Sequence, residues 1–221
     1  MKTIRILWLI PGEENHPSSM CFVKRQLTVL KERSELQMEV FFMGKTRSPL
    51  NLFRRFINLN SVIKDFVPHL IHAQYGTVTS AFGAVSLKWP LVISYRGSDL
   101  NTSPGDHWAR NLFGKLLSQF SAYRASYIIC VSEQLRQKLW RRNIPIEVIP
   151  SGVDLELFSP ISRNQARRKL EWDQHDPVVL FNAGSNPITK GLSLASDTVN
   201  FARQKIPNLK FNPRFRENKF G

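Results

Sequence analysis

The feature that most constrains the fold of this chain is the alternation of short apolar runs with longer segments of helical periodicity. The apolar runs are continuous, which is typical of strands in a parallel sheet whose two faces are both covered. Each intervening segment is long enough for a helix that crosses back over the sheet. The predicted strands occupy residues 4–10, 38–43, 70–73, 91–95, 127–131, 147–149 and 178–182, and the predicted helices 20–33, 50–66, 78–88, 107–124 and 133–142.

This βαβ series predicts an α/β protein with a Rossmann-like, doubly wound parallel sheet. A second unit begins with the strand at 178–182 and a helix over about 191–205, but the residues from Asn212 on show no helix or strand pattern. The chain has 221 residues, whereas two full domains need roughly 300. We therefore expect a complete first domain over 1–158, a linker with a short helix over 159–176, and an incomplete second Rossmann-like domain over 177–221.

The charge balance indicates an anionic partner. The chain has 31 Lys and Arg against 17 Asp and Glu, a formal net charge of +14. Nucleic acid, a phosphorylated substrate and anionic lipid would each suit that charge. The basic residues are scattered and form no helix-turn-helix pattern, so we do not expect nucleic acid as the partner.

Targeting signals and a disulfide framework are not expected. The apolar run at the N-terminus is interrupted by Arg5 and ends in Pro-Gly-Glu-Glu, which is unlike a signal peptide. No stretch approaches the roughly 20 apolar residues of a spanning helix. The two cysteines, Cys21 and Cys130, are too few for a disulfide framework. We expect a cytoplasmic protein, with peripheral contact on the inner face of the membrane as a further possibility.

Several enzyme classes lose their main sequence signature here. No Gly-x-Gly-x-x-Gly follows the first predicted strand, and no Gly-x-x-x-x-Gly-Lys-Ser/Thr occurs. His-Glu-x-x-His and Gly-x-Ser-x-Gly are absent as well. These absences disfavour dinucleotide oxidoreductases, P-loop enzymes, zinc proteases and α/β-hydrolases.

Polar residues instead follow the predicted strands, at the edge where open α/β sheets bind ligands. Gly12 follows the first strand and would let backbone N–H groups approach a phosphate, or would simply form a turn. His72 and Gln74 follow the third strand, where a hydrogen-bonded core histidine is the alternative to a ligand contact. Arg96 and Asp99 follow the fourth, where they either bind a ligand or pair with each other to order the loop.

The segment 49–57 mixes aromatic and basic residues. It could lie on anionic lipid, or form a crossover helix with its apolar side on the sheet. Segments of this kind are more often crossover helices, and Arg54, Arg55 and Lys64 would then lie on the solvated face.

Five pieces of the chain occur in a characteristic order. They are LIHAQYG at 70–76, PLVISYRGSD at 90–99, ASYIICVS at 125–132, VIPSGVD at 148–154 with FSP at 158–160, and FNAG at 181–184 leading to Lys190-Gly191. In this order and spacing they resemble the retaining glycosyltransferase family 4, whose members have the two-domain GT-B fold. The similarity extends to about Leu209.

The resemblance implies transfer of a sugar from a nucleotide-sugar donor, as co-substrate, to an acceptor, without a metal or a dissociable cofactor. In this family the N-terminal domain holds the acceptor, often lipid-linked or part of a surface polysaccharide, and the C-terminal domain holds the donor. The resemblance makes His72, Gln74, Arg96 and Asp99 candidates for the acceptor side of the cleft. It implies donor-phosphate contacts at Gly12, Ser185 and Lys190, and a hinge at Ser151, Gly152 and Asp154.

The chain departs from the family pattern at several positions. Gln74 and Arg96 stand where members often have histidines, and Ser185 stands where they usually have an arginine. Beyond the hinge no two glutamates are eight positions apart, so the Glu-x7-Glu motif of the donor domain is missing. We therefore do not expect the chain to catalyse transfer alone. Two interpretations remain: a glycosyltransferase of surface polysaccharide or glycolipid biosynthesis, and an inactive truncated fragment whose acceptor-domain scaffold binds a membrane or a partner.

Overall fold

The fold is described from a computed structural model, which defines residues 3–15, 20–44, 48–102, 107–184 and 186–215. Within these residues the chain forms two compact units that meet between Gly152 and Val153. We call them unit 1, up to Gly152, and unit 2, from Val153 on. Each unit is described by itself.

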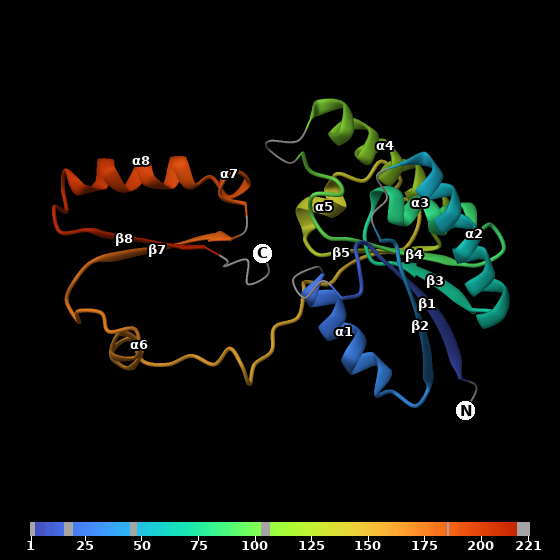
Figure 1. The fold of residues 1–221 in the computed structure, drawn as a ribbon, viewed down its shortest axis with the longest axis horizontal. Helices are drawn as coiled ribbons and strands as arrows, with labels where there is room; N and C mark the ends of the chain where they lie inside the picture. Colours follow the sequence, from blue (N-terminus) through green and yellow to red (C-terminus); the bar gives the residue numbers. More distant parts are fainter. Residues whose placement is uncertain (1–2, 16–19, 45–47, 103–106, 185, 216–221) are drawn as a thin grey trace. The chain divides into compact units, whose positions relative to one another are not determined.

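Unit 1 is built on one sheet of six parallel strands in the order β2-β1-β3-β4-β5-β6 (Figure 1). This arrangement confirms the predicted Rossmann-like α/β class. The change of direction in the strand order lies at β1, with β2 on one side and β3 to β6 on the other. The strands are β1 (Ile4–Ile10), β2 (Leu36–Phe42), β3 (Leu70–Ala73), β4 (Leu91–Tyr95), β5 (Tyr127–Cys130) and β6 (Ile146–Val148).

Helices cover both faces of this sheet, which explains why the strands are apolar throughout. Leu7 and Leu9 of β1 belong to one buried cluster, with residues of α2, α3 and α4. Trp8 and Ile10 belong to a second cluster, with residues of α1 on the opposite face. The helices are α1 (Cys21–Lys31), α2 (Pro49–Phe66), α3 (Thr77–Val85), α4 (Trp108–Arg124) and α5 (Glu133–Gln137).

Helix α5 is shorter than the sequence pattern predicted. It ends at Gln137, not at residue 142. Gln119 of α4 explains the early end, because its side-chain amide donates to the carbonyl of Lys138 (2.8 Å) and accepts from the backbone N–H of Trp140 (3.1 Å). These bonds satisfy backbone groups that a longer helix would have paired internally.

We predict that Gln119→Ala destabilises unit 1. The substitution leaves two backbone groups beside a buried side chain without their partners, and we expect the free energy of unfolding to fall by about 1–3 kcal/mol. Urea unfolding followed by circular dichroism measures the change. The matched control is Gln134→Ala, at an exposed position of α5. Equal stability of the two variants would contradict this role of Gln119.

Unit 2 contains two parallel strands, β7 (Val178–Gly184) and β8 (Lys210–Phe215), with the helices α6 (Arg163–Lys169), α7 (Pro187–Lys190) and α8 (Leu192–Arg203). The expectation that the residues from Asn212 on form no strand was wrong for 212–215, because β8 continues through Pro213. In the β7-β8 order, β8 is an edge strand, where a residue without an N–H is tolerated.

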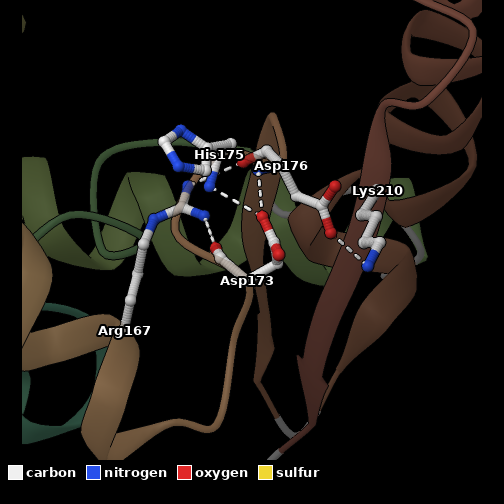
Figure 2. A network of polar contacts seen from close by, with 5 residues as sticks. All are labelled: Arg167, Asp173, His175, Asp176 and Lys210. Carbon is white, nitrogen blue, oxygen red and sulfur yellow. Dashed lines mark hydrogen bonds and ion pairs between the residues drawn. The ribbon is translucent and has the colours of Figure 1, made fainter.

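A polar network fixes α6 to the start of β7 in unit 2, as Figure 2 shows. The guanidinium of Arg167 donates to the backbone carbonyls of Asp173 and Asp176. The carboxylate of Asp173 accepts from the backbone N–H groups of His175 (2.7 Å) and Asp176 (3.1 Å), and these bonds lower the pKa of Asp173. Lys210 of β8 forms an ion pair with Asp176. The turn between α6 and β7 is thus held by Arg167 of α6 and by Lys210 of β8.

Candidate functional site

The candidate residues of unit 1 gather at the carboxyl ends of β3 and β4. Those two strands are neighbours and parallel, so the residues that follow them lie side by side. Hydrogen bonds run in series from Arg96 through Gln74 and His72 to Ser94. The structure therefore brings together the four residues expected on the acceptor side, since Asp99 is bonded to the backbone of Arg96, and it adds Ser94.

The direction of the first hydrogen bonds in the series is fixed by the guanidinium. Arg96 Nη2 donates to Gln74 Oε1, so the amide nitrogen of Gln74 faces His72, where it lies 3.2 Å from Nδ1 and 3.3 Å from Nε2. His72 Nε2 is also hydrogen-bonded to Ser94 Oγ (2.9 Å). Gln74 is fully buried, so both ends of its amide are committed to protein partners.

His72 is a neutral imidazole in this site. Burial and the positive charge of Arg96 lower the pKa of His72 from 6.5 to about 3. The ring of Trp8 packs edge-on against it, with 5.4 Å between ring centroids. His72 therefore supports Gln74 and Ser94 instead of taking up a proton at neutral pH.

We predict a specific acid sensitivity that depends on His72. Below pH 6.5 the unfolded chain binds a proton at this histidine and the folded chain does not, so folding stability falls as the pH drops toward 3. Relative to His72→Gln, the free energy of unfolding of the unmodified protein should decrease by about 1.4 kcal/mol per pH unit in that window.

Chemical unfolding of both proteins between pH 4 and pH 8 measures this difference. Above pH 7.5 the difference should be constant, which provides the internal control. Parallel pH dependences over the whole range would show that His72 is not held neutral by the fold.

Asp99 orders the loop after β4. It is fully buried, and its carboxylate accepts from the backbone N–H groups of Arg96 (2.9 Å), Gly97 (2.7 Å) and Gly76 (3.1 Å). Burial raises the pKa of Asp99, while these backbone hydrogen bonds act in the opposite direction. The contact between Arg96 and Asp99 thus runs through the backbone of Arg96, and the guanidinium is used elsewhere.

Gly76, which joins β3 to α3, has no room for a side chain. A Cβ atom there would lie 2.6 Å from Ser118 Oγ, 2.8 Å from Asp99 Cβ and 2.9 Å from a ring carbon of Tyr95. The glycine lets the loops after β3 and β4 close on each other, so that Asp99 can reach its backbone N–H. Ser118 completes this contact by donating to the carbonyl of Asp99 (2.8 Å) and accepting from the N–H of Thr77 (2.8 Å).

Helix α1 supplies two contacts that the sequence analysis missed. The guanidinium of Arg96 lies over the ring of Phe22, 5.0 Å from its centroid, and Nη2 also donates to Gln26 Oε1 (3.2 Å). Phe22 and Gln26 are four positions apart, which places them on one side of the helix. That spacing was visible in the sequence, but nothing in it linked α1 to the end of β4.

Gly12 follows β1 with a φ of 85°, a conformation that favours glycine. Its carbonyl accepts from the N–H of Gly44 (2.8 Å), which forms a single antiparallel bridge between the segments after β1 and β2. Gly44 also has a positive φ, of 63°, and the guanidinium of Arg55 lies where its Cβ would be. The glycine of the first loop is thus held by a neighbouring loop.

In unit 2, the Lys190 side chain lies beside Gly184, the last residue of β7. A Cβ atom on Gly184 would be 3.7 Å from Lys190 Cε. Lys190 is exposed and ends α7. Ser185, the other expected phosphate contact, lies outside the described residues.

The expected hinge residues Ser151, Gly152 and Asp154 are exposed and lie where unit 1 passes into unit 2. Asp154 Oδ1 accepts from the backbone N–H groups of Glu156 and Leu157, both at 3.0 Å. A side chain on Gly152 would meet no atom within 4 Å. The segment therefore contains one local turn, at Asp154. The space around Gly152 is open.

A cavity of about 650 Å³ in unit 2 lies at the other ends of the strands. Val178 and Lys210, the first residues of β7 and β8, line it together with Trp172, Asp176 and Arg203. Lys190 follows the carboxyl end of β7, so the cavity and Lys190 belong to opposite edges of this sheet. The sequence analysis did not anticipate the cavity.

Comparison with known proteins identifies the family. A six-stranded parallel sheet with helices on both faces defines the class of Rossmann-like α/β proteins. The model of glycosyltransferase family 4 matches residues 22–157, which is more than half of the chain. The chain belongs to this family, as the sequence resemblance predicted. No curated protein matches the chain.

Solved structures of GT-B proteins share the fold. Sucrose-phosphate synthase from Thermosynechococcus elongatus is 13% identical, with a TM-score of 0.66 over 96% of this chain and 70% of its own. UDP-GlcNAc 2-epimerase from Neisseria meningitidis, bound to UDP-GlcNAc, is 12% identical, with a TM-score of 0.59 over 97% and 67%. A glycosyltransferase from Rickettsia africae is 12% identical, with a TM-score of 0.57 over 99% and 69%. The chain thus spans 67% to 70% of the lengths of these three structures.

None of the helices within the described residues is both long and apolar enough to span a membrane. No group of three or more His, Cys, Asp or Glu side chains in the described ranges is placed to hold a metal ion.

Proposed function

We propose that the protein transfers a sugar from a nucleotide-sugar donor to a glycan or lipid-linked acceptor, in the synthesis of a surface polysaccharide or glycolipid. The observation that carries this proposal is the match to glycosyltransferase family 4 over residues 22–157. The polar residues at the carboxyl edge of the unit 1 sheet support it, because open α/β sheets bind ligands there. The similarity to a structure that holds UDP-GlcNAc adds support for a nucleotide-sugar ligand.

In this proposal, residues 1–158 form the acceptor-type domain, 159–176 the connection, and 177–221 the beginning of the nucleotide-sugar domain. Ser151, Gly152 and Asp154 act as the hinge. Their exposure and the open space around Gly152 support this assignment, since a hinge needs backbone that is free of tight packing.

Lys190 of unit 2 is proposed to contact the donor diphosphate, and Gly12 is kept as a phosphate candidate of unit 1. Transfer leaves negative charge on the departing phosphate, and a fixed cation stabilises that charge as it develops. Lys190 is an exposed cation that lies beside Gly184, the last residue of β7. The nucleotide sugar is the co-substrate, and the proposal involves no other cofactor.

We predict that Lys190→Ala weakens nucleotide-sugar binding about tenfold, the effect of losing one charge-assisted hydrogen bond. Titration of the full chain with a panel of nucleotide sugars, by calorimetry or ligand-detected NMR, measures the affinities. Lys205→Ala, at an exposed lysine just beyond α8, is the control and should bind like the unmodified protein. Failure of every nucleotide sugar to bind would count against the proposed function, and equal binding by both variants would remove Lys190 from it.

The proposal includes contact of unit 1 with the surface of the membrane that carries the acceptor. Segment 49–57 forms the start of α2, a crossover helix that buries Leu59 and Ile63 against the sheet. Its first half leaves Leu50, Phe53 and Ile57 exposed. Exposed apolar side chains beside basic ones are typical of helices that lie on anionic lipid.

Helix α4 offers a second exposed apolar face in unit 1. Trp108, Leu112, Phe113 and Phe120 are all between 49% and 71% exposed. The helix contains basic residues and no Asp or Glu. Both helices thus combine apolar exposure with positive charge, which suits an anionic bilayer surface.

We predict that the double variant Trp108→Ser/Phe113→Ser binds less to vesicles that contain phosphatidylglycerol. The substitutions remove two large exposed side chains that would enter the lipid interface, while the folded core is untouched. Vesicle sedimentation measures the bound fraction, with phosphatidylcholine vesicles as the neutral comparison. Val29→Ser, an exposed apolar position on α1, is the control. Unchanged sedimentation of the double variant would remove α4 from the proposal.

The alternative interpretation, an inactive fragment that serves as a binding scaffold, is not favoured by these findings.

A further inference from the structure

We propose that Arg96 binds an oxyanion of the substrate, a carboxylate or a phosphate, at the carboxyl edge of the unit 1 sheet, and that this contact selects substrates that carry such a group. The inference rests on the proposed function, since it specifies which ligand chemistry the acceptor-type site recognises. It is carried by the position and the support of the Arg96 guanidinium, and by its lack of a direct ion pair within the described residues.

The four candidate residues differ in how accessible they are to a ligand. Gln74 and Asp99 are fully buried and His72 nearly so, and all three are engaged by protein groups. Arg96 is only partly buried. Of the four residues that the sequence analysis placed on the acceptor side, Arg96 is therefore the one that presents its side chain at the edge of the sheet.

The Arg96 guanidinium is held by contacts with three other side chains. Its plane lies over Phe22, and Nη2 donates to the side-chain oxygens of Gln26 and Gln74. A long side chain that is fixed on three sides loses little further conformational entropy when it binds a ligand. The support comes from both α1 and β3, so the guanidinium is preorganised.

Among the described residues, the groups in direct contact with the Arg96 guanidinium carry no negative charge. The partners of the guanidinium are two neutral amide oxygens and an aromatic ring, while the carboxylate of Asp99 is taken up by backbone N–H groups. In the described part of the chain, ion pairs join Arg136 to Glu133 and Lys210 to Asp176, and none involves Arg96. Burial lowers the pKa of Arg96, while the negative charge of Asp99 acts in the opposite direction and offsets part of the cost of burying the cation. An oxyanion that contacts the guanidinium directly offsets more of that cost.

The Arg96 guanidinium has N–H donors that take part in no hydrogen bond described above. The Nε atom of Arg96 is buried without a hydrogen-bond partner. The hydrogen bonds of the guanidinium to Gln26 and Gln74 both start from Nη2, so Nη1 takes part in neither of them. An oxyanion has several acceptor oxygens and can satisfy a guanidinium at two nitrogens, whereas a single sugar hydroxyl cannot neutralise it.

Two sources of the oxyanion are chemically equivalent at this level. One is the carboxylate of an acidic sugar, and the other is a phosphate of a phosphorylated acceptor or of the donor. The NMR titration with separate anions distinguishes the two sources.

The test is an NMR titration of the full chain labelled with ¹⁵N-arginine. The Nε–H signal of Arg96, identified by its absence in Arg96→Gln, is followed with sodium glucuronate, inorganic phosphate and glucose. We expect a saturable shift with glucuronate, phosphate or both, and none with glucose. A response to glucuronate alone assigns the carboxylate, and a response to phosphate alone assigns the phosphate. No shift with either anion, or an equal shift with glucose, would overturn the proposal.

Variants extend the test. Arg96→Gln should weaken anion binding at least about tenfold, and Arg96→Lys, which keeps the charge but loses the fork, should lie between. Arg54→Gln, an exposed position on α2, controls for general attraction by the basic protein. Circular dichroism verifies folding, and if Arg96→Gln does not fold, Arg96→Lys decides. Equal weakening by Arg54→Gln would refute a specific site. This readout needs no nucleotide sugar, so its failure leaves the Lys190 titration to judge the proposed function separately.

Discussion

Burial of β1 on both faces is the constraint on which the rest of unit 1 depends. Leu7 and Leu9 need cover on one side, and Trp8 and Ile10 need it on the other. Parallel strands with helices on both faces satisfy this requirement, and they bring the carboxyl ends of all strands to one edge. The position of the candidate site therefore follows from the way the apolar strand is buried.

At that edge, the protein treats its charged groups in two different ways. The Asp99 carboxylate accepts hydrogen bonds from three backbone N–H groups, and these bonds hold the loops after β3 and β4 together. The Arg96 guanidinium is given neutral partners and an aromatic support. His72, which is linked to Arg96 through Gln74, stays neutral because burial and the charge of Arg96 lower its pKa.

The sequence was sufficient for the fold class and the family, because continuous apolar runs and ordered short motifs are local signals. The bounds of β1, β3 and β4 were predicted to the residue. Local signals could not reveal contacts between distant segments. The end of α5 depends on Gln119 in another helix, and the continuation of β8 through Pro213 depends on its place at the edge of a sheet.

The candidate site shows the same limit. The sequence placed His72, Gln74, Arg96 and Asp99 together through their positions after neighbouring strands. It could not show that the Asp99 carboxylate would accept hydrogen bonds from backbone N–H groups. Nor could it show that Phe22 and Gln26 of α1 would contact the Arg96 guanidinium. Those outcomes depend on side-chain packing between elements that are tens of residues apart.

The absence of space at Gly76 separates two parts of the edge of the sheet. Any side chain at Gly76 would push apart Ser118, Asp99 and Tyr95. The Arg96 guanidinium makes its contacts with Phe22, Gln26 and Gln74, none of which is among those neighbours. The junction between the two loops and the support of the guanidinium therefore rest on different side chains.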